Sequence, residues 1–133
     1  MTTTSTTPVR TRNRFHHDAY QFLSAALRHS QRLLGRIARQ DDDEDEAHVS
    51  GGELLDGVRD LARRQFGLLA PAVFRHWGIE GTEDFGRMVF ELIDRGEMKR
   101  TENDHLSDFV DVYDFETEFD RNYRIDTSHA FRG

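Results

Sequence analysis

The stretch that decides the fold is FRHWGIEGTEDFGRMVFELIDRGEMKR, residues 74–100. Its glycines mark where helices are expected to end. Gly78 should close a short helix over Leu69–Trp77, because glycine readily takes the left-handed conformation that follows a helix. Thr82 is expected to cap a longer helix that stops at Gly96. Two helices joined by so short a turn are typical of a helix-turn-helix motif.

The longer helix, Thr82–Arg95, carries one apolar face. Apolar residues recur on it at helical spacing, namely Phe85, Met88, Val89, Leu92 and Ile93. Phe90 lies off this stripe, so an exposed Phe90 would mark a contact with another protein. Gly86 lies within the helix and suggests close approach by another backbone. In the shorter helix Trp77 is expected to face the core, and Ile79 is placed for the apolar contact of a Schellman ending.

After the longer helix the sequence predicts two strands. Residues 97–101 are expected to form the first, residues 102–107 a polar turn, and FVDVYDF at 109–115 the returning strand. Phe119 and Tyr123 suggest a last helical turn that packs back on the core. The predicted fold is therefore mostly α (α+β), a four-helix core with a C-terminal β-hairpin, similar to a winged helix-turn-helix.

Two further helices are predicted upstream. Asp18–Arg39 has apolar residues at alternating spacings of three and four, which favours an amphipathic helix. The next helix should begin at a capping box, in which Ser50 is the N-cap and Glu53 the third helical residue. Gly67 is expected to end it. The two glycines that follow Ser50 would let another group approach the backbone closely.

The chain is expected to form one domain. Residues 1–16 are rich in threonine and arginine and lack an apolar period, so we interpret them as a disordered tail. Residues 17–125 form the predicted globular domain, which includes an acidic loop at residues 40–47. Residues 126–133 are interpreted as a second disordered tail.

Within that loop, Asp41–Glu46 reads DDDEDE, six consecutive acids that repel one another. A calcium-binding loop that starts at Asp42 would place Glu53 at its twelfth position. It would also place Ala47 where the geometry requires a glycine, which argues against a calcium site. The loop could instead shield the arginines of the first helix.

Charge is unevenly distributed along the chain. Residues 1–40 contain seven arginines and one acid, for a net charge of +6, whereas residues 41–133 have a net charge of −13. Four arginines recur on one face of the first helix, namely Arg28, Arg32, Arg36 and Arg39. This face is either simply solvated or a docking stripe for an acidic partner or a phosphate backbone.

The candidate recognition helix is acidic. Glu83, Asp84, Glu91 and Asp94 outnumber Arg87 and Arg95, whereas a helix that enters a DNA groove should be basic or neutral. The sequence therefore favours a non-enzymatic protein-interaction module. Nucleic-acid binding through the arginine face of the first helix is the alternative, and an enzyme or accessory subunit without a recognisable motif is the second alternative.

No pattern for catalysis, metal or cofactor binding is found. The chain has no cysteine, no phosphate-binding glycine loop, no nucleophile elbow and no HExxH pair, so we expect no cofactor and no metal. His48 precedes the capping box, and a loop hydrogen bond is its favoured role. No apolar run approaches the ~20 residues that a membrane span needs, so a membrane partner is not expected. Nothing in the sequence specifies the oligomeric state.

Residues 18–125 resemble an uncharacterised family restricted to Planctomycetes and Verrucomicrobia. The matching stretches are DAYQFLSAAL, HVSGGELLDGVRDLARRQFG, HWGIEGTEDFGRMVFELIDRGEM and DFVDVYDF, followed by Phe119 and Tyr123. The resemblance implies a bacterial cytoplasmic protein and brings no activity, ligand or catalytic residue with it. The Thr-rich tail and DDDEDE depart from the family.

Overall fold

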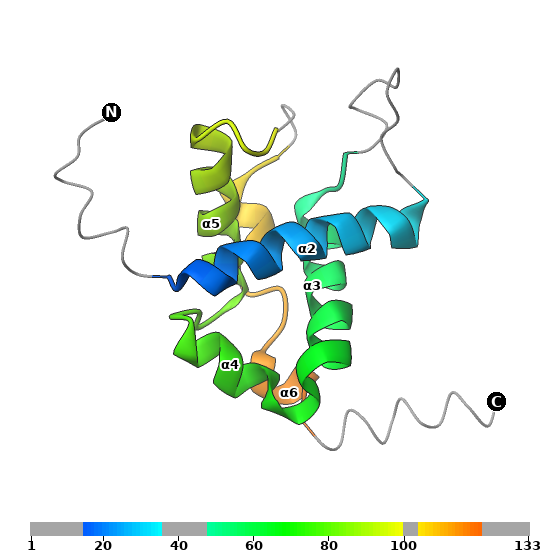
Figure 1. Ribbon diagram of the computed structural model, residues 1–133, viewed down its shortest axis with the longest axis vertical. Helices are drawn as coiled ribbons and strands as arrows, with labels where there is room; N and C mark the ends of the chain where they lie inside the picture. Colours follow the sequence, from blue (N-terminus) through cyan, green and yellow to red (C-terminus); the bar gives the residue numbers. More distant parts are fainter. Residues whose placement is uncertain (1–14, 36–47, 100–103, 121–133) are drawn as a thin grey trace, which may run out of the picture.

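The computed structural model describes residues 15–35, 48–99 and 104–120, and these form one packed helical body. In chain order the elements are α2 (His17–Leu34), α3 (Gly51–Phe66), the 3-10 helix η2 (Gly67–Leu69), α4 (Ala70–His76), α5 (Thr82–Asp94), the 3-10 helix η3 (Leu106–Phe109) and α6 (Phe115–Glu118). Figure 1 shows α2 lying across α3 and α5, with α4 and α6 packed at the far end of α3. Neither α2 nor any other described helix could serve as a membrane span, because none combines the required length and apolarity.

The predicted start of α3 is confirmed. Ser50 Oγ accepts a hydrogen bond from the Glu53 backbone N–H at 3.1 Å, and Glu53 Oε1 accepts one from the Ser50 N–H at 3.0 Å. These two bonds satisfy amide donors that the first helical turn would otherwise leave unpaired. The end of α3 at Gly67, with φ +56°, is confirmed as well.

Both predicted glycine endings around α5 are confirmed. Gly78 has φ +89°, and the Ile79 N–H donates to the Phe74 carbonyl at 2.8 Å, which is the Schellman bond. Gly96 has φ +81° and repeats the arrangement, since the Glu97 N–H donates to the Leu92 carbonyl at 2.8 Å. Ile79 is fully buried, so the turn between α4 and α5 is fastened to the core.

The first helix is shorter than predicted. Gly35 adopts φ +70° and its N–H donates to the Arg32 carbonyl at 3.1 Å, so α2 ends at Leu34 rather than at Arg39. At its other end His16 caps the helix by accepting the Asp18 N–H at 3.0 Å. The backbone N–H of His16 also donates to the backbone carbonyl of Trp77 at 3.0 Å, which ties the start of α2 to the end of α4.

Aromatic residues from five elements and their flanks make the centre of the core. Phe74 is fully buried, and its ring packs edge-on against Phe85, with ring centroids 5.3 Å apart, and against Phe115 at 4.9 Å. Trp77 is buried as predicted, and its ring lies against those of Phe22 and Phe74. The cluster therefore joins α2, α4, α5 and α6 at one point.

The predicted β-hairpin is wrong. Among the described residues there is no strand: residues 97–99 are irregular, Leu106–Phe109 form η3, and Phe115 begins α6. The alternation in FVDVYDF is real, because Phe109 and Phe115 are buried while Val110 and Val112 are exposed. The described chain is thus helical and lacks the wing of a winged helix-turn-helix.

Hydrogen bonds to α3 and α5 take the place of a partner strand. Thr82 Oγ1 donates to the Phe109 carbonyl at 2.7 Å and accepts the Val112 N–H at 3.1 Å. Tyr113 Oη donates to the Leu55 carbonyl at 2.6 Å, and burial raises the pKa of this hydroxyl, so it remains a donor at neutral pH. Asp111, with φ +49°, interrupts the extended backbone between these anchors.

Thr82 does not cap α5, contrary to the prediction. The N-cap is Gly81, which makes no side-chain cap bond, and Thr82 is only 2% exposed. Its hydroxyl is directed to the C-terminal segment instead of to its own helix. A buried hydroxyl needs a partner, and here the partners come from residues 27 and 30 positions further along the chain.

The close approach expected at Gly86 is present, but an aromatic side chain makes it rather than a backbone. A Cβ at Gly86 would lie 2.6 Å from Phe109 Cγ, and one at Gly51 would lie 3.0 Å from the far end of the same ring. Phe109 is therefore held between the first turn of α3 and the middle of α5. The predicted close approach at the start of α3 is confirmed at Gly51, while Gly52 faces open space.

Candidate functional site

A cavity of about 480 Å³ opens between α2, the start of α3 and the C-terminal half of α5. Its walls are mainly apolar, formed by Leu27, Val49, Leu54, Val89, Phe90, Ile93, Met98 and Phe109. Its polar lining residues include Gln31, His48, Glu97, Lys99 and Asp104. The volume falls within the range of about 300–1,000 Å³ that is usual for ligand pockets.

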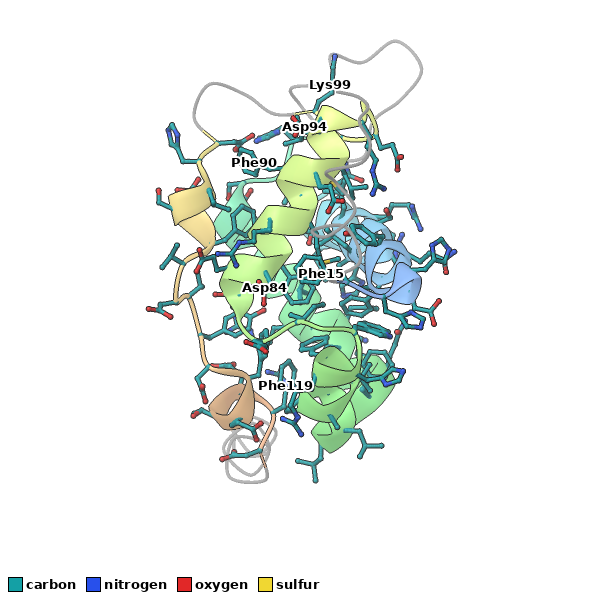
Figure 2. The ribbon with its side chains drawn as sticks, turned by 90° about the vertical axis from the view of Figure 1, so that its left-hand side faces the viewer. Phe15, Asp84, Phe90, Asp94, Lys99 and Phe119 are labelled. Atoms are coloured by element: carbon teal, nitrogen blue, oxygen red, sulfur yellow. The ribbon has the colours of Figure 1, made fainter. Side chains whose placement is uncertain are left out.

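Phe90 is one wall of this cavity. The sequence marked it as an interface candidate because it lies off the main stripe of α5, and in the structure it is partly buried against the core. Figure 2 shows Phe90 and Lys99 near the C-terminal end of α5, whereas Phe119 lies at the opposite end of the molecule. An aromatic wall in an open apolar cavity is suited to contact with another apolar group.

His48 and Asp104 close one side of the rim. His48 Nε2 lies 3.2 Å from Asp104 Oδ1, and the two side chains are 25% and 16% exposed. The loop hydrogen bond predicted for His48 is therefore confirmed, and it joins the segment before α3 to the segment before η3. No cluster of three or more metal-ligating side chains occurs within residues 15–35, 48–99 and 104–120. The cavity is thus suited to apolar binding with hydrogen bonds at its edge.

The arginine face of α2 lies beside the cavity and not in it. Arg28 and Arg32 are exposed, and neither makes an ion pair with a residue that the structure describes. Each follows a residue that lines the cavity, Leu27 or Gln31. Arg36 and Arg39, the other two arginines of the predicted stripe, and the acidic run Asp41–Glu46 lie outside the described residues.

The charges on α5 are largely paired within the helix. Arg87 binds Glu83 at 2.8 Å and Asp84 at 2.7 Å. Arg95 binds Glu91 at 3.1 Å, and Tyr20 Oη donates to the same carboxylate at 2.7 Å. With its two arginines occupied in this way, α5 presents an acid-rich surface.

A second polar cluster, which the sequence did not reveal, joins α2 to α3. His29 Nε2 lies 2.7 Å from Asp60 Oδ2, and Arg64 Nε donates to the same oxygen at 2.8 Å. Burial alone would raise the pKa of Asp60, but the hydrogen bonds from His29 and Arg64 outweigh it and lower the pKa below the usual value. His29 and Asp60 are 31 positions apart, so no local pattern relates them.

This cluster predicts a pH-dependent contribution to stability. Since the pKa of Asp60 is lower in the folded state, its contribution is present above the unfolded value of about 4 and is lost as pH falls through the folded pKa. Asp60→Asn should lower the free energy of unfolding by about 1 kcal/mol at pH 7, and the difference from wild type should be smaller at pH 3. Urea denaturation at both pH values measures it.

Asp56→Asn is the matched control for this prediction. Asp56 lies on the same helix and pairs with Arg59, but its side chain is 65% exposed. A surface ion pair of this kind contributes little, so the control should change stability by less than about 0.5 kcal/mol. An Asp60→Asn effect that is equal at pH 7 and pH 3 would contradict the role assigned to the carboxylate.

The residues that line the cavity come from four separate stretches of the chain, 27–31, 48–54, 89–99 and 104–109. Comparison with known proteins gave no match to a family model, to a curated protein or to a solved structure. The geometry of this site is therefore what bears on function.

Proposed function

We propose that the protein is a small, non-enzymatic interaction module that binds an apolar segment of a protein partner in the cavity beside α5. The observation that carries the proposal is the partly open cavity of about 480 Å³ with its apolar walls and Phe90 among them. Amphipathic helices are commonly recognised by grooves of this kind, into which they place apolar side chains. The rim residues His48 and Asp104 would then contact the polar edge of the bound segment.

The charge of the surface favours a protein partner over a nucleic acid. Residues 104–120 contain seven acids and no lysine or arginine, and α5 is acid-rich as well. Phosphate backbones are repelled by such a surface over roughly 8–10 Å in physiological salt. The compartment that we propose is the bacterial cytoplasm, in keeping with the absence of cysteine and with the family resemblance of residues 18–125.

Selection from a peptide library on the purified protein tests this proposal. Enriched peptides should carry two or more large apolar residues at helical spacing, and Phe90→Ala should weaken their binding by about tenfold or more. Loss of an aromatic anchor in a buried contact commonly costs over 1 kcal/mol, and about 1.4 kcal/mol corresponds to tenfold in affinity. Fluorescence anisotropy with a labelled peptide measures the dissociation constant.

Phe66→Ala is the control variant. Phe66 is the same residue type, is also partly buried against the core, and does not line the cavity. Its alanine variant should bind the selected peptides within about twofold of wild type, and thermal melting should show that both variants are folded. Peptides that bind Phe90→Ala as tightly as wild type would refute the assignment of the cavity.

A further inference from the structure

Two exposed surfaces of the protein each combine apolar side chains with charges of one sign. The charges are positive on the first surface and negative on the second. The first, the basic end of α2, consists of Arg28, Arg32, Leu33 and Leu34. The second, the acidic strip, consists of Leu106, Asp108, Val110, Asp111 and Val112. In a chain of which 32% is charged, exposed large apolar residues beside uncompensated charges are typical of contact surfaces.

The basic end of α2 projects beyond α3, as Figure 1 shows. Leu33 is 56% exposed and Leu34 is 40% exposed, because no helix of the described part of the chain covers the last turn of α2. Arg28 and Arg32 add two positive charges that no described carboxylate neutralises. This surface would therefore fit an acidic partner with apolar residues among its charges.

The acidic strip has the complementary composition. Leu106, Val110 and Val112 are 39%, 45% and 42% exposed. Asp108 and Asp111 are exposed and pair with no lysine or arginine in the described part of the chain, although Asp108 accepts the His105 N–H at 3.0 Å. The inward residues Phe109 and Tyr113 anchor the segment, so its outward residues are presented on a fixed backbone.

These two surfaces cannot meet within one molecule. Figure 2 shows α2 and η3 on opposite sides of α5. We propose that the basic end of α2 of one copy docks on the acidic strip of a second copy, so that the protein assembles head to tail. An interface between two different surfaces of the same chain leaves one of each exposed, and further copies can add until a ring closes. This inference goes beyond the proposed function, since neither surface lines the cavity.

Sedimentation velocity of the purified full-length chain at increasing concentration tests the assembly. The weight-average mass should rise above twice the 15.5 kDa of one chain at low salt and should fall towards one chain as salt is raised. A mass that stays at one chain up to the solubility limit would overturn the proposal. A mass that levels off at two chains at saturation would overturn the head-to-tail geometry.

Charge exchange tests the two surfaces directly. Arg28→Glu with Arg32→Glu should abolish assembly, and so should Val110→Lys with Val112→Lys, at side chains that are 45% and 42% exposed. Mixing the two variants should restore a complex, because the acidic strip of the first fits the unchanged arginines of the second. If the two variants remain monomeric when mixed, the assignment of the two contacting surfaces is contradicted. Assembly of either variant alone would contradict it as well.

Asp94→Lys and Phe90→Ala serve as controls. Asp94 is exposed on α5 and belongs to neither surface, so its charge reversal should leave the mass distribution unchanged. Phe90→Ala should weaken the binding of peptides in the cavity and preserve the assembly, which separates this inference from the proposed function. Loss of assembly in the Phe90→Ala variant would place the contact at the cavity instead.

Discussion

Replacing Phe109 with alanine is expected to lower the free energy of unfolding by about 3–5 kcal/mol, the usual cost of removing a buried phenylalanine side chain. Phe109 is 3% exposed and fills the space between Gly51 of α3 and Gly86 of α5. Because neither glycine has a side chain that could move into the gap, little collapse can offset the cavity. The C-terminal segment would lose the anchor that holds it on the helices.

Thermal and urea denaturation measure this change, and the melting temperature should fall by about 10 °C or more. Leu106→Ala is the control, since Leu106 belongs to the same 3-10 helix and is 39% exposed. Its effect should stay below about 1 kcal/mol. Equal effects of the two substitutions would show that Phe109 is not the anchor of this segment.

Gly57→Ala is expected to destabilise the protein by about 2 kcal/mol, although glycine to alanine inside a helix ordinarily stabilises by about 0.5–1 kcal/mol. A Cβ at Gly57 would overlap Ser30 Oγ and would lie 3.2 Å from the Ala26 carbonyl oxygen. These atoms belong to α2, so α2 and α3 would have to separate where they cross. Overpacking of this kind typically costs about 1–3 kcal/mol and opposes the gain in helix propensity.

Gly52→Ala provides a control on the same helix. A Cβ there meets nothing within 4 Å, so this substitution should be neutral or stabilising by up to about 0.5 kcal/mol. The double variant Ser30→Ala with Gly57→Ala should recover part of the loss, because it removes the oxygen that overlaps the new Cβ. If Gly57→Ala and Gly52→Ala changed stability in the same direction, the tight crossing of α2 and α3 would be refuted. Urea denaturation gives each free energy.

The elements that could be predicted are those specified within a few residues. The capping box of Ser50 and Glu53 and the endings at Gly78 and Gly96 require only hydrogen bonds between near neighbours in the chain. The apolar stripe of α5 follows from a repeat of three and four residues. The missed end of α2 at Gly35 is of the same local kind, and the glycine was the available signal.

The C-terminal segment shows why the hairpin prediction failed. Alternation in FVDVYDF predicts which side chains are buried, and the burial of Phe109 and Phe115 agrees with it. Alternation does not specify which group accepts or donates the backbone hydrogen bonds. In this protein the Thr82 hydroxyl supplies that partner, since it donates to the Phe109 carbonyl and accepts the Val112 N–H, so the segment stays irregular and no strand forms.

For the candidate site, the sequence showed that Phe90 lies off the apolar stripe of its helix. It also showed that arginines recur on one face of the first helix. It did not identify the cavity, whose walls range from Leu27 to Phe109 along the chain. Nor did it pair His48 with Asp104, which are 56 positions apart.

The amino-acid sequence by itself determined that four main helices form, where α3 starts and which stripe of α5 is buried, because those features depend on side chains within one or two turns. The tertiary structure decided how the C-terminal segment lies, where the cavity opens and which charges are paired among the described residues. These features depend on contacts between residues distant in the chain, such as Phe109 with Gly86 and Asp60 with His29. Such contacts exist only once the helices have packed.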